Sequence, residues 1–466
     1  MLYTALKPIV GIALHWYYRS LIVASAERIP QDGPVFLAAN HPNSLTDAMV
    51  VGWIAPRRVR FTAKATLFAN PIGAWFLRRV GVVPLRRAAD EAARMSASAT
   101  PAAEHPDGVA PDAARNASAF SAVADALAAQ ACMVIFPEGK THDEPYMAPL
   151  RTGLARMALM ARDERGVRGI RIVPVGLLFE NKSQPRTRVL VQVGEVIDVD
   201  RVPAGVSAVA TLTELIDQRL RAVTLNFENH ADAERIQLLG STLAALIEPS
   251  TSVDEGAPPL ARTLSLVRRI ERAQRTIRER RDKTLTARVD LFESRLRTFH
   301  DRLAREGINV HDVRIDLRAS LGVRFVVREL AVAALMFPII AWGRLTHFVP
   351  IRITRVLALR NVRALDEPPQ RTFILGLALV LATYAVLGTV VGVLAGPWWA
   401  LAFLASLIPS ASADLRYGDR LQRVLARARA YRRLRAAPAL QASLRDDADW
   451  LQSEAGALER VAATTP

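Results

Sequence analysis

A long uncharged stretch near the C-terminus constrains this chain more than any other feature of its sequence. Residues 372–394 carry no charged side chain, and a helix of that length crosses the hydrocarbon core of a bilayer. Gly396 and Pro397 interrupt this run, and residues 398–410 offer a shorter apolar return segment that begins with two tryptophans. The sequence therefore predicts a transmembrane helical hairpin at about 372–411, with a hairpin in a soluble core as the alternative.

Arginines flank the predicted hairpin on both sides. Five precede it and five follow it: Arg352, Arg355, Arg360, Arg363 and Arg371, then Arg416, Arg420, Arg423, Arg427 and Arg429. Because cytoplasmic flanks are enriched in positive charge, both ends of the hairpin are expected in the cytoplasm. We therefore expect a protein of the cytoplasmic (inner) membrane whose active site faces the cytoplasm. An earlier apolar segment, 330–342, is short for a span and predicts an interfacial or re-entrant helix.

The overall charge indicates anionic partners. Among 466 residues, 61 Lys and Arg stand against 45 Asp and Glu, a net charge of +16. This balance suits nucleic acid, an acidic membrane surface or phosphorylated substrates. Because no helix-turn-helix, zinc-ligand or RNA-binding pattern accompanies the charge, we expect membrane lipids and no nucleic acid as partners. The single cysteine, Cys132, excludes an intrachain disulfide and a cysteine-based metal site.

Short apolar runs alternate with helical patterns through the first half of the chain. An N-terminal interfacial helix is expected over residues 1–19, and strands at 21–25 and 35–40 lie on either side of a turn. Later segments alternate in the same way, which predicts an α/β domain with a mixed sheet flanked by helices over residues 20–205. Within it, residues 88–119 are rich in Ala, Ser and Pro and predict a flexible insertion.

The remaining sequence predicts a different architecture. Residues 206–320 are polar and helical, and we expect a long helical extension, a helical hairpin in form. An apolar heptad stripe in it favours packing on a partner helix of the same chain over a dimeric coiled coil; it comprises Leu285, Val289, Phe292, Leu296, Phe299 and Leu303. Residues 321–430 are expected to be membrane-associated, and residues 431–466 to form a polar C-terminal helix or tail.

A histidine and a carboxylate mark the first candidate site. Residues 38–47 read AANHPNSLTD, which places His41 where a strand gives way to a helix and Asp47 shortly after it. A neutral imidazole can take a proton from an alcohol, and a carboxylate on its other nitrogen fixes the tautomer and stabilises the imidazolium. Ser44 is expected to cap the helix; no Gly-x-Ser-x-Gly elbow supports a hydrolase.

A second candidate site follows a buried strand. Residues 134–145 read VIFPEGKTHDEP, and the sharp exit at Pro-Glu-Gly can expose backbone N–H groups beside Lys140, an arrangement that suits a phosphate. Glu138 is expected to order the loop or to bind a hydroxyl of the substrate. His142 is interpreted as a loop histidine.

Taken together, these segments resemble a known family. NHPNSLTD, AKATLFANPIGAWFLRRVGVVPLRR, VIFPEGKTH and IVPVGL resemble, in order and spacing, the four motifs of the glycerol-phosphate and lysophosphatidate acyltransferase family. The resemblance covers about residues 20–200. It implies an acyl-CoA or acyl-carrier-protein thioester as co-substrate, and neither a metal nor another cofactor.

Carried over by position, the resemblance assigns roles to individual residues. His41 is the base and Asp47 its orienting partner. The acceptor and its phosphate are implied to be bound by Lys64, Arg86, Arg87, Glu138, Gly139 and Lys140. Pro174 belongs to an apolar wall near the acyl chain.

The chain departs from the family pattern at two points. Five residues separate His41 from Asp47 where four are usual, which requires a bulge or a looser turn before the helix. This His-Pro-Asn variant resembles the fungal-type glycerol-3-phosphate and dihydroxyacetone-phosphate acyltransferases. In the third motif, Thr141 stands where arginine is common, and Lys140 precedes it.

The sequence leaves three functions open. The favoured one is acyl transfer to glycerol 3-phosphate or dihydroxyacetone phosphate, and acyl transfer to 1-acylglycerol 3-phosphate is the alternative. A third hypothesis, of another class, is a catalytically weak, lipid-binding membrane scaffold that keeps the fold. A His41–Asp47 separation beyond the reach of a bridging water would favour the scaffold.

Overall fold

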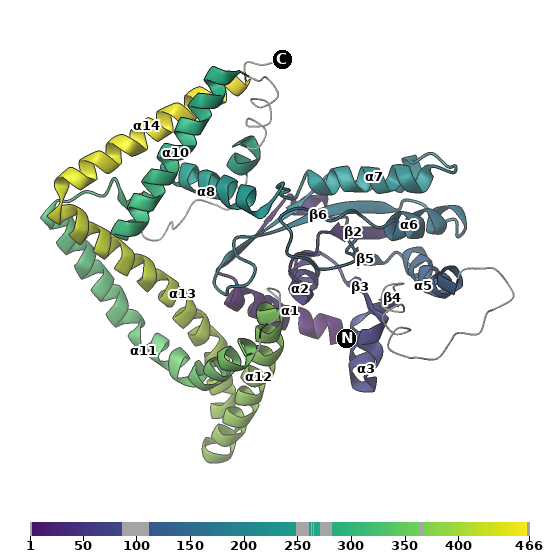
Figure 1. Ribbon diagram of the computed structural model, residues 1–466. Helices are drawn as coiled ribbons and strands as arrows, with labels where there is room; N and C mark the ends of the chain where they lie inside the picture. The colour runs from purple at the N-terminus through teal and green to yellow at the C-terminus, as the bar shows by residue number, and fades with distance from the viewer. Residues whose placement is uncertain are drawn as a thin grey trace. The chain divides into compact units, whose positions relative to one another are not determined.

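The computed structural model describes residues 2–85, 111–247, 261, 263, 265–270, 282–360, 362 and 367–463 (Figure 1). The chain divides into two compact units. Unit 1 comprises Met1–Asn226 with Asn361–Phe373, and unit 2 comprises Phe227–Arg360 with Ile374–Pro466. Arg86 and Arg87, and most of the predicted insertion, lie outside the described residues.

Unit 1 is built on an eight-stranded mixed sheet with the path β1-β7-β6-β2-β5-β3-β4, and β8 pairs with β6 beside this path. The strands are β1 (Ser20–Ala24), β2 (Val35–Ala39), β3 (Val59–Lys64), β4 (Val82–Leu85), β5 (Cys132–Ile135), β6 (Arg171–Phe179), β7 (Arg188–Val193) and β8 (Ile197–Asp198). The central strand β2 runs parallel to both of its neighbours, β5 and β6. Segments that leave the carboxyl ends of these strands therefore meet at one edge of the sheet.

Helices cover both faces of this sheet (Figure 1). They are α1 (Leu2–Tyr17), α2 (Leu45–Ile54), α3 (Pro71–Val80), α5 (Pro111–Ala128), α6 (Gly153–Asp163) and α7 (Ala208–Arg221). Alternate side chains of β2 enter different cores, because successive strand residues point to opposite faces. Phe36 and Ala38 join the core under α5, α6 and α7, whereas Leu37 joins the core with α1 and α2.

The structure corrects two sequence-based expectations in this unit. The α/β unit extends past residue 205, because Leu212, Ile216 and Leu220 of α7 are buried in its core. The predicted insertion ends before residue 119, because α5 begins at Pro111. The first two strands flank a turn as predicted; β1 pairs with β7, and β2 lies between β5 and β6.

Unit 2 contains a helical core formed by α8 (His230–Ile247), α10 (Lys283–Glu306) and α14 (Pro438–Ala463). Most of the heptad stripe on α10 is buried, including Phe292, Leu296 and Phe299. The stripe packs on α14 as well as α8, so a C-terminal helix supplies much of the partner surface that a sequential hairpin was expected to provide.

Three helices in the described part of the chain are long and apolar enough to cross a membrane. They are α11 (Ala319–Ala358), α12 (Glu367–Ala395) and α13 (Pro397–Ala436). The break at Gly396 between α12 and α13 matches the predicted hairpin. The segment 330–342 is not a short helix, since it is part of the 40-residue α11. Length alone therefore no longer excludes this segment from spanning.

Candidate active site

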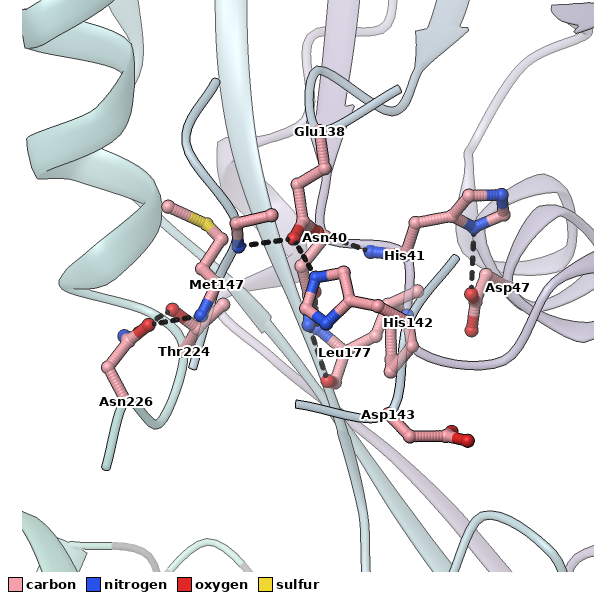
Figure 2. A network of polar contacts seen from close by, with 12 residues as sticks. Asn40, His41, Asp47, Glu138, His142, Asp143, Met147, Leu177, Thr224 and Asn226 are labelled. Carbon is pink, nitrogen blue, oxygen red and sulfur yellow. Dashed lines mark hydrogen bonds and ion pairs between the residues drawn. The ribbon is translucent and has the colours of Figure 1, made fainter. Parts of the chain in front are cut away.

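The two candidate motifs meet at the carboxyl edge of the central strands. His41 follows β2 by two residues, and Glu138 follows β5 by three. Because β2 and β5 are parallel neighbours, the two loops leave the sheet side by side. The backbone N–H of His41 donates a hydrogen bond of 2.9 Å to Glu138 Oε1, which joins the loops directly (Figure 2).

His41 and Asp47 form the predicted pair. His41 Nδ1 lies 2.9 Å from Asp47 Oδ2, and the same oxygen accepts a 2.7 Å bond from the backbone N–H of Asn43. Asp47 is fully buried, whereas the His41 side chain is 15% exposed. An ionised carboxylate can only accept, so Nδ1 carries the proton and the lone pair remains on Nε2. The lone pair on Nε2 can therefore accept a proton.

A strained residue accommodates the extra position between His41 and Asp47. Ser44, which directly precedes α2, has φ 51° and ψ −125°, a backbone conformation that non-glycine residues rarely adopt. The chain is thereby turned so that Asp47, in the first turn of α2, faces back toward His41 (Figure 2). Ser44 occupies the capping position, but its side chain makes no capping hydrogen bond, so that expectation was wrong.

The surroundings of the pair hold the imidazole in position. Complete burial raises the pKa of Asp47, and the hydrogen bonds from His41 and from the Asn43 N–H offset part of this effect. The His41 ring stacks on Phe136, with ring centroids 3.9 Å apart and an interplanar angle of 14°. The imidazole is therefore held at one edge by Asp47 and on one face by an aromatic ring.

Glu138 is held in place by hydrogen bonds from other residues of the protein. Its side chain is buried, and Oε1 accepts the bond from His41 N. Its other oxygen, Oε2, accepts 2.8 Å and 2.6 Å bonds from the Ala148 N–H and His142 Nε2. Glu138 was expected either to order the loop or to bind a substrate hydroxyl, and these contacts favour ordering of the loop. His142 contributes by its hydrogen bond to Glu138.

Lys182 is a residue of this network that the sequence did not single out. Its ammonium group donates to the carbonyl oxygens of Pro42, at 3.2 Å, and His142, at 3.3 Å, and pairs with Asp143 at 2.5 Å. One cation thus fastens the His41 loop to the Glu138 loop. Lys182 lies between β6 and β7, about 140 residues from His41, and its polar loop carried no motif that could reveal the contact.

Two asparagines complete the support of the His41 loop. Asn40 makes paired hydrogen bonds with the backbone of Leu177 in β6, at 2.7 Å and 3.1 Å (Figure 2). The Asn43 side chain is buried and donates to the carbonyl of Lys182 at 3.1 Å. Both asparagines flank the His-Pro pair of the motif, and this position could have indicated that they support His41. The sequence did not reveal the residues to which they bind.

The other predicted site residues have mixed outcomes. Gly139 adopts φ +73°, which explains a glycine at the turn, and Lys140 next to it is exposed. Pro174 is buried in β6 in register with Ala38, and its contact with an acyl chain stays a prediction. The backbone of Lys64 ends β3, but its side chain, like Arg86 and Arg87, lies outside what the structure describes.

The sheet, the histidine–aspartate pair and the motif order together define a class. Residues 20–178 match the protein family described as Acyltransferase, so this part of unit 1 is an acyltransferase domain. The matched segment contains His41, Asp47 and Glu138, the three side chains around which the two loops are organised.

Individual relatives are similar over shorter stretches. Glycerol-3-phosphate O-acyltransferase 2 of Saccharomyces cerevisiae is 38% identical over 85 residues, 18% of this chain and 11% of its own. Glycerol-3-phosphate O-acyltransferase 1 of the same yeast is 28% identical over 128 residues, 26% of this chain and 17% of its own. This chain thus matches less than a fifth of the length of either relative.

Among solved structures, the 1-acyl-sn-glycerophosphate (LPA) acyltransferase PlsC from Thermotoga maritima overlaps 47% of this chain and 78% of its own, with 18% identity and a TM-score of 0.33. That likeness is too weak to support an assignment of substrate.

Proposed function

We propose that this protein is a membrane acyltransferase that moves a fatty acyl group from a thioester to a hydroxyl of glycerol 3-phosphate. The observation that carries the proposal is the 2.9 Å contact between His41 Nδ1 and the buried Asp47 carboxylate within the acyltransferase domain. Similarity to two proteins named glycerol-3-phosphate O-acyltransferases supports this acceptor over the 1-acylated one. Dihydroxyacetone phosphate has the same hydroxyl and phosphate and is a further candidate acceptor.

In the proposed reaction, His41 serves first as base and then as acid. Nε2 removes the proton from the acceptor hydroxyl while its oxygen attacks the thioester carbonyl carbon. Asp47 stabilises the imidazolium that forms and keeps the ring oriented. The tetrahedral intermediate then collapses, the carbon–sulfur bond breaks, and the thiolate leaves with the proton returned from Nε2. The products are an ester and a free thiol, and no side chain of the protein is acylated.

Positive charge near the site suits the acceptor phosphate. Lys140 is exposed one residue after the turn at Gly139, on the loop that Glu138 holds against His41. We propose that Lys140 binds the phosphate, together with the basic residues at the end of the second motif. The donor is acyl-CoA or an acyl-carrier protein, and the site faces the cytoplasm of a cytoplasmic membrane.

The scaffold hypothesis loses its support from geometry. It required His41 and Asp47 to be separated because of their wider spacing in the sequence. The strained turn at Ser44 brings them into direct contact, so the additional residue does not disrupt the pair.

Acyl transfer by purified protein in liposomes tests the proposal. Glycerol 3-phosphate, dihydroxyacetone phosphate and 1-acylglycerol 3-phosphate are supplied separately, each with acyl-CoA and with acyl-carrier protein. We expect product from the wild type and from His15→Gln, a control histidine exposed on α1, and background turnover from His41→Ala. Equal rates for His41→Ala and the wild type contradict the mechanism, and preference for the 1-acyl substrate contradicts the acceptor.

A further inference from the structure

We propose that α11 does not cross the membrane: it lies along the bilayer surface, and only the α12–α13 hairpin spans. All three helices in the described part of the chain have the length and composition of a span, so composition alone does not decide between them. The contacts at the ends of α11 do decide, because they fix on which side of the membrane each end lies.

The segment that follows α11 belongs to unit 1. Phe373, in the second turn of α12, is buried in the core of unit 1 among residues of α1 and the sheet. Its ring centroid lies 4.7 Å from that of Tyr17 and 6.4 Å from that of Tyr18. Phe373 therefore lies on the same side of the membrane as the acyltransferase domain.

The segment that precedes α11 lies on the same side of the membrane as the acyltransferase domain. The chain runs from Tyr18 to Val313 without a candidate span among its described residues. The undescribed stretches within it, 86–110, 248–260 and 271–281, are polar or charged and contain no apolar run of spanning length. A helix that begins just after Val313 and returns to Phe373 thus starts and ends on one side. One continuous helix cannot do this and also cross the bilayer.

The end of α13 confirms an even number of crossings. Leu434 in α13 and Leu444 in α14 are fully buried in the same core of unit 2 as Val313. The chain therefore leaves α13 on the side where it entered α11. Two crossings by α12 and α13 satisfy this condition, whereas three crossings would separate residues that share one core.

The packing of α11 is an independent second observation. Residues 329–344 of α11 pair with the charged half of α13 that follows Pro409. Trp342 also donates a 3.0 Å hydrogen bond to Ser406 before that proline, and His347 lies 2.7 Å from the hydroxyl of Tyr384 in α12. Arg344 pairs with Asp414 at 2.8 Å, and Glu329 pairs with Arg420 at 3.0 Å. Gly343 lies directly against the Ser410 backbone, where a Cβ atom would collide. The charged partner segment places the N-terminal half of α11 at the water interface, and its later residues meet the apolar hairpin within one leaflet.

The exposed apolar surface of α11 indicates that this helix contacts the lipid bilayer. Leu330, Leu335 and Phe337 are 64%, 73% and 68% exposed, an unusual surface in water. The charge-free run 330–343 lies between Glu329 and Arg344 and is about 21 Å long at ~1.5 Å per residue. That is short of the ~30 Å hydrocarbon core but fits a helix sunk into one leaflet, with its arginines at anionic headgroups.

Single-cysteine labelling of the full-length protein tests this topology. Cys132 is buried, and Cys132→Ala provides a cysteine-free background. Thr298→Cys on α10, Val362→Cys after α11 and Ala395→Cys at the hairpin turn are all exposed positions. A membrane-impermeant maleimide is applied to sealed right-side-out and inverted vesicles. We expect the first two cysteines to react from one side and Ala395→Cys from the other.

Reaction of Val362→Cys from the side opposite to Thr298→Cys would show that α11 spans and would overturn the proposal. Depth is measured separately with a fluorophore on Phe337→Cys and lipids brominated near the headgroup or near the bilayer centre. We expect at least threefold stronger quenching by the shallow bromines. Strongest quenching by the central bromines would contradict an in-plane helix, whatever the acyltransferase activity proves to be.

Discussion

Replacing Asp47 with asparagine separates the charge of this side chain from its hydrogen bonds. One carboxylate oxygen, Oδ2, accepts from both His41 Nδ1 and the Asn43 N–H. An asparagine whose amide oxygen takes that position keeps both bonds and the imidazole tautomer. The variant then lacks only the negative charge that stabilises the imidazolium formed when Nε2 takes the substrate proton.

The magnitude follows from the distance between the charges. With about 4 Å between the imidazolium and the carboxylate and an effective dielectric of about 20, the lost interaction is ~4 kcal/mol. At ~1.4 kcal/mol per tenfold change in rate, kcat is expected to fall by about three orders of magnitude. Because Asp47 is fully buried, KM for glycerol 3-phosphate should change little.

The assay is the initial rate of thiol release from acyl-CoA at saturating glycerol 3-phosphate, with Asp143→Asn as the matched control. Asp143 is a partly exposed carboxylate of the same network and pairs with Lys182 rather than with His41. We expect the control to retain most of the wild-type kcat. A kcat for Asp47→Asn within tenfold of the wild type, or an equal loss in both variants, would refute the role given to Asp47.

Three further predictions concern the frame of the site. Lys182→Met removes the cation that fastens the two loops and should lower kcat at least tenfold, with partial rescue by Lys182→Arg, measured in the same assay. Gly176→Ala would place a Cβ atom against the carbonyl of Val223 and should destabilise unit 1 by ~3 kcal/mol, seen as a lower thermal unfolding midpoint; an unchanged midpoint would contradict the packing. Burial raises the pKa of Glu180, but the hydrogen bonds and charge of Arg188 outweigh it and lower that pKa. Ionised Glu180 should therefore stabilise the fold above about pH 4.3, an advantage over Glu180→Gln that is lost as pH falls through the lowered pKa.

Local patterns predicted the elements around the site well. The helix α1 and the strand β2 lie within two residues of the bounds that the sequence indicated, 1–19 and 35–40. The contact between His41 and Asp47 was also predictable, since only five residues lie between them. Its geometry was not, because it depends on the unusual backbone of Ser44.

Contacts between distant segments could not be predicted from local patterns. The apolar stripe on α10 indicated a partner helix but did not show that much of this surface comes from α14. The assignment of α7 to unit 1 likewise depends on which core its apolar face enters. Lys182 is the clearest example at the site. It acts by binding the carbonyl groups of Pro42 and His142, and the residues next to Lys182 in the sequence do not indicate these contacts.

The hairpin is connected to the catalytic pair through side chains of unit 1 alone. Phe373, at the start of the predicted span, contacts the ring of Tyr18. The Tyr18 hydroxyl accepts a 3.4 Å hydrogen bond from the side chain of Asn43, whose backbone N–H binds Asp47 at 2.7 Å. The residues that orient the proposed base therefore also hold the start of the membrane hairpin. For the proposed reaction this link is useful, because a lipophilic product partitions into the bilayer that the proposed hairpin enters just after Phe373.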